Sequence, residues 1–191
     1  MPANNTEDLT ELGTILLSRA RQAIAHHLGL APPPTDDPRL AQRGACFVTL
    51  TLEGELRGCI GSIRPQRALG EDVVVNAVAA ASHDPRFPPL TADELEHVRI
   101  EVSLLSSPEF LDFSTEAELL RQLRPGEDGL ILFAGCRNAT FLPQVWEKLP
   151  DPASFLGALK EKAGLAAGRT VDGLMAARYN VRKWQENPQE V

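Results

Sequence analysis

Residues 46–61 read CFVTLTLEGELRGCIG, and they decide the fold because they carry a β-hairpin signal. The first half, Cys46 to Leu52, is rich in β-branched and aromatic residues. Glu53-Gly54-Glu55 offers a turn, and Leu56 to Ile60 returns as a second extended segment. The two strands of a hairpin pair in antiparallel fashion, so this stretch predicts a mainly antiparallel sheet.

The returning segment carries Cys59 between Gly58 and Gly61, shortly after the cationic Arg57. If the segment is extended, its two-residue period puts Arg57 and Cys59 on one face. A neighbouring guanidinium favours the thiolate, which is the nucleophilic and metal-binding form of cysteine, and the glycines let a ligand or another backbone approach closely. The alternative is a small buried cysteine at a strand end, with the glycines serving only a bulge or a turn.

Helices and strands are interleaved irregularly around the hairpin. A cap at Asn5 or Thr6 and apolar residues at three- and four-residue steps predict an N-terminal helix that ends at Gly29. The proline-rich residues 32–38 then form a stiff extended connection. Clean alternation from Val98 to Leu105 predicts a strand with one side against the core.

The remaining segments follow from caps and periodicity. They comprise a helix over Ala68 to Ser82 with a small, close-packing face, a capping box at Thr91 and Glu94, a helix over Thr115 to Leu123 capped by Ser114, a strand over Gly129 to Phe133, a helix from Asp151-Pro152 to Ala163, and a strand-like piece around Ala177 to Val181. Together these elements predict the α+β class, with helices flanking a mainly antiparallel sheet.

Length and composition indicate one globular domain over residues 1–191, with 43% hydrophobic and 24% charged residues. A net charge of −7 without a local run of lysine or arginine disfavours nucleic acid as a partner. The three irregularly spaced cysteines suit reduced thiols in a cytosol. No apolar stretch approaches the length of a transmembrane helix and the N-terminus is polar, so we expect a cytoplasmic protein with no membrane contact.

The chain resembles the AMMECR domain family, the A component of the AmmeMemoRadiSam system. The resemblance rests first on the hexapeptide Leu56-Arg57-Gly58-Cys59-Ile60-Gly61, which is the hallmark of that family. Further blocks match in the family's order, namely DPRFPP at residues 84–89 followed by Glu94-Leu95, EVSLL at 101–105, TFLPQVW at 140–146, and Arg178-Tyr179. The best-matched span is about residues 12–179.

This resemblance implies an α+β fold of two unequal lobes in one compact unit, with the hexapeptide in the cleft between the lobes. It also implies an association with Memo-type proteins, which are related to extradiol dioxygenases, and with radical-SAM enzymes. It supplies no established reaction and implies no cofactor.

Three charged residues near these motifs are further candidates for the site. Asp84 and Arg86 lie in a rigid proline-rich loop, where they bind a ligand, pair with each other or cap the preceding helix. Glu101 meets Arg57 or Cys59 as an acid, a base or an ion-pair partner, or it belongs to a solvated sheet face.

Thr140 and Gln144 offer hydroxyl and amide contacts to a polar ligand, or they cap a short helix. Trp146 is assigned to core packing. His83 is a tempting partner for Cys59, because a Cys-His pair generates a nucleophilic thiolate. The family motif begins after this histidine, so we give it at most an accessory role.

The sequence predicts no structural metal, because no histidine has ligand-like spacing to a cysteine. Gly58-Cys59-Ile60-Gly61 has the bare shape of the Gly-x-x-Gly loop of single-strand RNA-binding modules. It lacks the surrounding lysines of such modules.

Two functions from different classes remain open. In the first, an enzyme or enzyme subunit acts on a small anionic or carbonyl-containing molecule, with Cys59 as nucleophile or redox thiol, Arg57 as anion clamp, and Asp84 or Glu101 handling protons. In the second, a non-catalytic binding or adaptor protein docks a ligand or a partner. A third function, RNA binding, is motivated only by the glycine loop.

Overall fold

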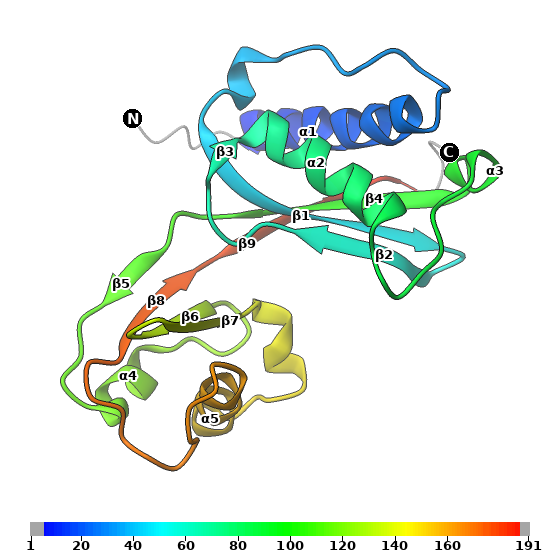
Figure 1. Ribbon diagram of the computed structural model, residues 1–191. Coiled ribbons are helices and arrows are strands. Elements are labelled where there is room, and N and C mark those ends of the chain that lie inside the picture. Colours follow the sequence, from blue (N-terminus) through cyan, green and yellow to red (C-terminus); the bar gives the residue numbers. More distant parts are fainter. Residues whose placement is uncertain (1–5, 188–191) are drawn as a thin grey trace. The chain divides into compact units, whose positions relative to one another are not determined.

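The computed structural model describes residues 6–187, which fall into two compact units of unequal length. The first unit runs to Leu105 and resumes at Arg182, and the second covers Ser106–Val181. Each unit has its own antiparallel sheet, flanking helices and hydrophobic core (Figure 1). The predicted α+β class is therefore confirmed.

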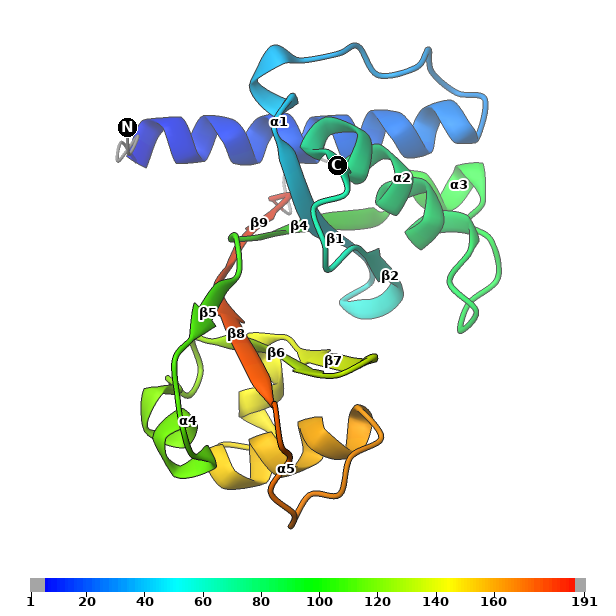
Figure 2. The same cartoon turned by 60° about the vertical axis from the view of Figure 1, so that its left-hand side comes forward.

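The first unit packs two long helices on one side of a sheet, as two views show (Figure 1, Figure 2). The strand order is β2-β1-β4-β9, and β3 pairs with the start of β1. The elements are α1 (Thr6–His27), η1 (Pro38–Leu40), β1 (Arg43–Leu52), β2 (Glu55–Gly61), β3 (Arg67–Ala68), α2 (Leu69–Ser82), α3 (Ala92–Leu95), β4 (Val98–Leu105) and β9 (Val181–Gln185).

The predicted hairpin is confirmed as β1 and β2. Its turn places Glu53 and Gly54 at positive φ, 53° and 86°, which is the backbone of a two-residue hairpin turn that matches the twist of the strands. The register shifts between Leu50 and Thr51, because Leu50 faces Gly58 and Thr51 faces Leu56. Arg57 is therefore the extra residue of a β-bulge.

The helix-covered face of the sheet forms the core of the first unit. Val48 and Leu50 of β1 and Ile100 of β4 are fully buried there. The small face predicted for α2 lets it approach the sheet closely: a Cβ built on Gly58 would lie 2.2 Å from the carbonyl oxygen of Ala80. Helix α2 is close enough that only glycine fits at this point of β2.

The opposite face of the same sheet carries a row of polar side chains. Thr49 of β1 faces both Cys59 of β2 and Glu101 of β4 in the strand register. Directly opposed residues of antiparallel strands share a face, so these three side chains lie side by side across three strands.

The second unit is a four-stranded sheet with the order β5-β8-β6-β7, packed on two helices. Phe155 is fully buried in its core, and the ring of Trp146 stacks on it with the ring centroids 3.7 Å apart. Its elements are β5 (Glu109–Leu111), α4 (Glu116–Gln122), β6 (Gly129–Ala134), β7 (Arg137–Phe141), η2 (Pro143–Glu147), α5 (Pro152–Lys162) and β8 (Met175–Tyr179).

Two of the predicted N-caps are confirmed, at Thr91 and Asp151, and a third is shifted by one residue. The capping box at Thr91 and Glu94 is present, but the cap of α4 is Thr115 rather than Ser114, because the Thr115 hydroxyl accepts from the Glu118 amide. Asn5, one of the two caps predicted for α1, lies outside the described residues. Among the described residues, no helix is both long enough and apolar enough to span a bilayer.

Candidate functional site

Cys59 lies in the middle of β2 with a partly exposed side chain. Its sulfur accepts a hydrogen bond from the hydroxyl of Thr49 across the strand pair, with Oγ1 and Sγ 3.3 Å apart. The thiol thus lies on the polar face of the sheet rather than in the aliphatic core. The sequence offered a buried cysteine at a strand end as one interpretation of Cys59. Its partly exposed side chain excludes that interpretation.

The Asp84–Arg86 pair holds the backbone of Cys59 from the free edge of the sheet. The Cys59 amide donates to Asp84 Oδ2 at 2.8 Å, and Arg86 Nη2 donates to the Cys59 carbonyl at 3.4 Å. The two side chains also bond to each other, through Nε to Oδ1 at 2.9 Å and Nη2 to Oδ2 at 2.6 Å. We call this arrangement the edge clamp. It satisfies the backbone groups that a neighbouring strand would otherwise pair with.

The edge clamp sets the ionisation of its two members. Hydrogen bonds from Arg86 hold the pKa of Asp84 well below its usual range, although burial of this carboxylate acts the other way. The same contact raises the pKa of Arg86. This low pKa favours the anionic form of Asp84 near neutral pH.

Arg57 does not face the thiol, and the predicted pairing of Arg57 with Cys59 on one face is wrong. Its guanidinium binds Glu94 of α3 in bidentate fashion, at 2.9 and 3.0 Å, and donates to the carbonyl of Pro88 at 2.9 Å. The bulge explains this outcome. An extra residue in one strand interrupts the two-residue alternation of side chains, so Arg57 no longer points to the same face as Cys59. The cation next to Cys59 is instead Arg86.

Glu101 lies beyond Thr49 in the polar row and not against the sulfur. It pairs with Lys183 of β9 at 3.5 Å and accepts from the Ser103 hydroxyl at 3.3 Å. Two strand spacings of about 4.8 Å separate its strand from that of Cys59. A ligand lying over Thr49 would reach both residues.

Gly58 and Gly61 serve close packing within the first unit. The sequence predicted that the glycines let either a ligand or another backbone approach closely. At Gly58 the group that approaches is the backbone of α2. At Gly61 an added Cβ would lie 2.2 Å from the ring of Phe47 and 2.7 Å from the carbonyl oxygen of Cys46. These two residues shape the strand that presents the thiol.

A buried polar network behind the hexapeptide was missed by sequence reasoning. Asp72 of α2 is 1% exposed and accepts from the amide of Cys46 at 2.9 Å, the hydroxyl of Ser62 at 2.7 Å and the amide group of Asn76 at 2.9 Å. It fastens the end of β2 to the start of β1. The available signal was the spacing of Asp72 and Asn76, which puts two polar residues four apart on the apolar face of the helix.

Thr140 and Gln144 both lie in the second unit. The Thr140 hydroxyl is buried and bonds to the carbonyl of Leu130 at 2.9 Å and to the hydroxyl of Tyr179 at 3.0 Å, so it caps no helix. Gln144 is exposed in η2. Trp146 is confirmed as core, with its ring nitrogen donating to the carbonyl of Asp128 at 2.7 Å.

Two histidines, His83 and His26, make contacts with groups other than Cys59. The Nδ1 atom of His83 lies 2.8 Å from the hydroxyl of its neighbour Ser82, and its side chain is exposed. His26 lies on the surface of α1, with Nδ1 3.0 Å from the carbonyl of Ala31. Within residues 6–187, no group of three or more histidine, cysteine or acidic side chains could hold a metal ion.

Comparison with known proteins identifies the family of this chain. The model of the AMMECR1 family matches residues 17–184. The chain belongs to the AMMECR1 family. A relative in Methanopyrus kandleri is 41% identical over 169 residues, covering 83% of this chain and 81% of that protein. One in Thermofilum pendens is 38% identical over 174 residues, covering 81% of this chain and 80% of that protein.

A solved structure shares the fold of this AMMECR1-family chain. It is the crystal structure of an uncharacterised protein from Pyrococcus horikoshii, with a TM-score of 0.79 and 33% sequence identity, over 93% of this chain and 92% of that one. The names of these relatives describe no reaction, so the site must be interpreted from its own geometry.

Proposed function

We propose that this AMMECR1-family protein binds a small polar molecule on the polar row around Cys59, and that the thiol reacts with it as a nucleophile or redox thiol. One observation carries the proposal. The backbone of Cys59 is held at both its N–H and its C=O by the edge clamp, and its sulfur is held by Thr49. Side chains fixed in this way are pre-organised for chemistry.

The positions of the residues around Cys59 suggest a role for each in the proposed reaction. For a carbonyl-containing ligand, the sulfur donates an electron pair to the carbonyl carbon, a C–S bond forms, and the carbonyl oxygen takes the π pair and the proton that left the thiol. The sequence assigned the role of anion clamp to Arg57. Arg86 suits this role better: both arginines are paired with a carboxylate, but the Arg86 side chain is 53% exposed beside Cys59 and the Arg57 side chain only 11%. Glu101 and Lys183 would contact the far end of the ligand.

A second function, non-catalytic binding or adaptor activity, is favoured by a different observation. The charged residues of the hexapeptide and its loop form internal pairs, Arg57 with Glu94 and Arg86 with Asp84. Such pairs suit a rigid docking surface for a protein. The association with Memo-type and radical-SAM proteins, which follows from the family resemblance, belongs to this proposal.

Iodoacetamide labelling of the intact protein separates the two functions, with each cysteine quantified by peptide mass spectrometry. The exposed Cys136 serves as an internal reference thiol. If Cys59 is reactive, it is alkylated faster than Cys136 although it is less exposed, and Arg86→Gln slows its alkylation. Arg64→Gln, which removes an exposed arginine outside the clamp, leaves the rate unchanged.

The opposite result supports the adaptor function. If Cys59 is alkylated more slowly than Cys136 across the pH range, the thiol is not activated and the nucleophile proposal is abandoned. Cys59→Ser then retains binding to a Memo-type partner in a pull-down with purified proteins. Under the enzymatic proposal the same variant folds normally but loses activity in an assay with that partner.

A further inference from the structure

The first sheet ends in two borders that differ in how their backbone groups are bonded. At β2 the edge clamp binds both the N–H and the C=O of Cys59. At the opposite end of the strand order lies β9, and no further strand of the described chain pairs with its far side. We call this far side the β9 border. An unpaired strand presents a row of N–H and C=O groups to which another chain can bond.

The backbone groups that face outward at the β9 border follow from the bonds between β9 and β4. The amide of Glu186, directly after β9, donates to the carbonyl of Ile100 in β4 at 3.0 Å. Along a strand, the N–H and C=O of one residue point to the same neighbour, and the side alternates from residue to residue. Trp184 therefore bonds toward β4, whereas Lys183 and Gln185 turn their backbone groups to the open border.

A groove of about 460 Å³ lies at this border, between α1 and the end of β9. This volume falls in the usual range of ligand sites. Trp184 and Leu17 supply apolar surface, and Gly13 of α1 makes room for the indole, because an added Cβ would lie 2.2 Å from its ring. The wall on α1 also carries hydroxyl side chains at four-residue steps, which lie in one line along the helix: Thr10, Thr14 and Ser18.

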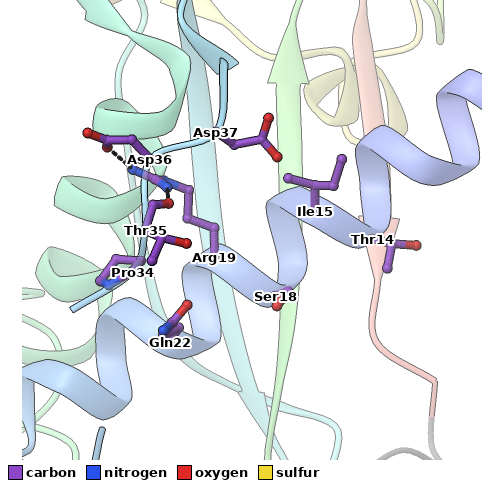
Figure 3. Close-up of a pocket in the computed structure, with 9 residues that line it drawn as sticks. All are labelled: Thr14, Ile15, Ser18, Arg19, Gln22, Pro34, Thr35, Asp36 and Asp37. Carbon is purple, nitrogen blue, oxygen red and sulfur yellow. Dashed lines mark hydrogen bonds and ion pairs between the residues drawn. The ribbon is translucent and has the colours of Figure 1, made fainter. Parts of the chain in front are cut away.

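A second cavity, of about 320 Å³, borders α1 as well, and Figure 3 shows Thr14 and Ser18 among its lining residues. Its other wall is the proline-rich segment 34–37, which Arg19 holds through the carbonyl of Thr35 and the carboxylate of Asp36 (Figure 3). This cavity is lined by α1 and that segment alone. It offers a ligand no strand border, unlike the groove at β9.

The charges at the β9 border are positive. Arg182 is exposed and has no ion-pair partner among residues 6–187, and the Lys183 side chain is 46% exposed and meets Glu101 at 3.5 Å. The carboxylate of Glu186 is neutralised by Arg21, which binds it through two nitrogens at 2.6 and 2.5 Å. The whole chain carries a net charge of −7, yet this border attracts an acidic partner.

We propose that the β9 border binds an extended acidic segment of a partner protein, which adds to the first sheet as a further strand. Successive side chains of such a segment point to opposite faces. An apolar side chain opposite Trp184 enters the groove, and the acidic side chains next to it lie beside Lys183. Main-chain bonds to Lys183 and Gln185 supply affinity, and the alternation of acidic and apolar residues supplies specificity.

A second copy of this chain is a poorer occupant of the same border. Pairing of β9 with β9 would bring Arg182 and Lys183 of one copy against the same cations of the other. Like charges on paired strands are destabilising. An acidic segment meets no such repulsion, so the charge of the border selects a different protein as the partner.

Three synthetic peptides, acetylated and amidated, test the chemistry of the segment by titration calorimetry with the full chain. TDLDLDLT alternates acidic and apolar residues and binds. TKLKLKLT has the same pattern with the opposite charge, and TDDDLLLT has the same composition without the alternation. We expect both to bind at least about 10-fold more weakly. Equal binding of the three peptides overturns the proposal.

Methylation of peptide amides tests whether the segment adds as a strand. Only every second N–H of an added strand bonds to the border. TDLDLDLT is therefore prepared with methyl groups on its three aspartate amides or on its three leucine amides. One isomer retains binding and the other loses it. Equal retention or equal loss in the two isomers contradicts strand addition.

A proline variant tests the same bonds from the side of the protein. Gln185→Pro removes one outward N–H and leaves the bonds to β4 in place, because an edge strand tolerates proline where its N–H faces solvent. It weakens binding of TDLDLDLT by at least about 10-fold, whereas Gln185→Ala keeps the N–H and the affinity. Equal affinities of the two variants overturn the proposal. Urea denaturation shows whether Gln185→Pro is folded, and if it is not, the methylated peptides decide.

Charge variants locate the acidic side chains of the peptide. Arg182→Gln weakens binding by about 3- to 5-fold, the size expected for an exposed ion pair. Arg64→Gln removes an exposed arginine of the same unit away from β9 and leaves the affinity unchanged. Equal losses in both variants would show non-specific attraction and contradict the assignment.

Two further measurements separate this site from its alternatives. Sedimentation velocity gives the same coefficient for the full chain with and without Gln185→Pro, and a dimer that this variant dissociates would make a second copy the occupant and overturn the proposal. Cys59→Ala binds TDLDLDLT normally, because the β9 border is independent of the chemistry at Cys59. Peptide binding that depends on Cys59 would contradict the assignment.

Discussion

Cys46 and Cys59 lie on neighbouring strands of one sheet, and the two faces of that sheet give them opposite surroundings. Cys46 is completely buried, its Sγ lies 3.4 Å from Asp72, and burial followed by the charge of Asp72 raises its pKa well above the usual range. Cys59 is partly exposed, bonded to Thr49 and next to the Arg86 guanidinium. Residue type alone does not decide the surroundings of a cysteine; the face of the sheet does.

The largest expected effect is the difference in alkylation between the two thiols. In a Cys136→Ser background, iodoacetamide modifies Cys59 in the native protein, whereas Cys46 reacts only when the first unit unfolds. Because folding protects Cys46 and it reacts only in the rare unfolded state, we expect its alkylation rate to be lower than that of Cys59 by more than roughly 10³-fold. Quantitative peptide mass spectrometry checks this result, and comparable native rates at both cysteines would remove the contrast between the faces.

Next in size is the effect of removing the buried carboxylate behind Cys46. Asp72→Ala leaves the amide of Cys46 and the hydroxyl of Ser62 without their acceptor, so we expect a loss of about 3 kcal/mol in the free energy of unfolding. Urea denaturation measures it. Glu71→Ala, in the same turn of α2 but exposed, is the control and costs less than about 0.5 kcal/mol.

Gly58→Ala tests the close approach between α2 and β2. The new Cβ would lie 2.2 Å from a backbone oxygen of Ala80, so the helix must shift and about 2 kcal/mol of stability is lost. Gly168→Ala, with open space around the added Cβ, is the matched control. If both variants are equally stable, the spacing between helix and sheet is looser than the structure indicates.

A pH-dependent effect follows from Glu94. Its bond to Arg57 lowers its pKa from 4.5 to about 2, so this carboxylate stabilises the fold above pH 4.5 and loses that contribution as the pH falls toward 2. Both partners are less than a third exposed. Glu94→Gln therefore costs about 1–2 kcal/mol at pH 7, and the difference from wild type shrinks at low pH.

Urea denaturation at several pH values measures this difference, with Asp93→Asn on the same helix as a control that carries an exposed carboxylate. A gap between wild type and Glu94→Gln that stays constant from pH 7 to acid pH would contradict the assigned ion pair.

The smallest effect concerns the hydroxyl next to the thiol. Thr49→Val removes a single hydrogen bond to Cys59, so we expect a change of only about 0.5–1 kcal/mol in stability. The alkylation rate of Cys59 changes by a few-fold at the same time, because the hydroxyl orients the sulfur. Thr51→Val, two residues along the same strand, serves as the control, and an unchanged Cys59 rate in Thr49→Val would mean that the bond has no role in reactivity.

Local sequence signals predicted most of the fold. The hairpin turn, the capping box at Thr91 and the helix that starts after Asp151 all depend on residues within a few positions of one another, and all three are present. The short strands β5 and β7 were not predicted. Their three and five residues carry little periodicity, and their pairing with distant strands defines them.

The candidate site was predicted less completely, for a physical reason. The family motifs pointed to Cys59, Asp84 and Arg86, and the structure brings these three together. The position of Arg57 was wrong because a bulge, which depends on pairing between strands, interrupts the two-residue period. Asp72 was missed because a polar residue on an apolar helix face shows its role only when its partners on other elements are known.

The order of the strands has a consequence for synthesis. β9 borders β4 in the first sheet, yet the whole second unit, residues 106–181, separates the two strands in the chain. Trp184 of β9 also packs against the core of the first unit. A nascent chain emerging from the ribosome therefore holds a first sheet with one open border until the second unit has been translated, and a chaperone that shields this border would act during that interval.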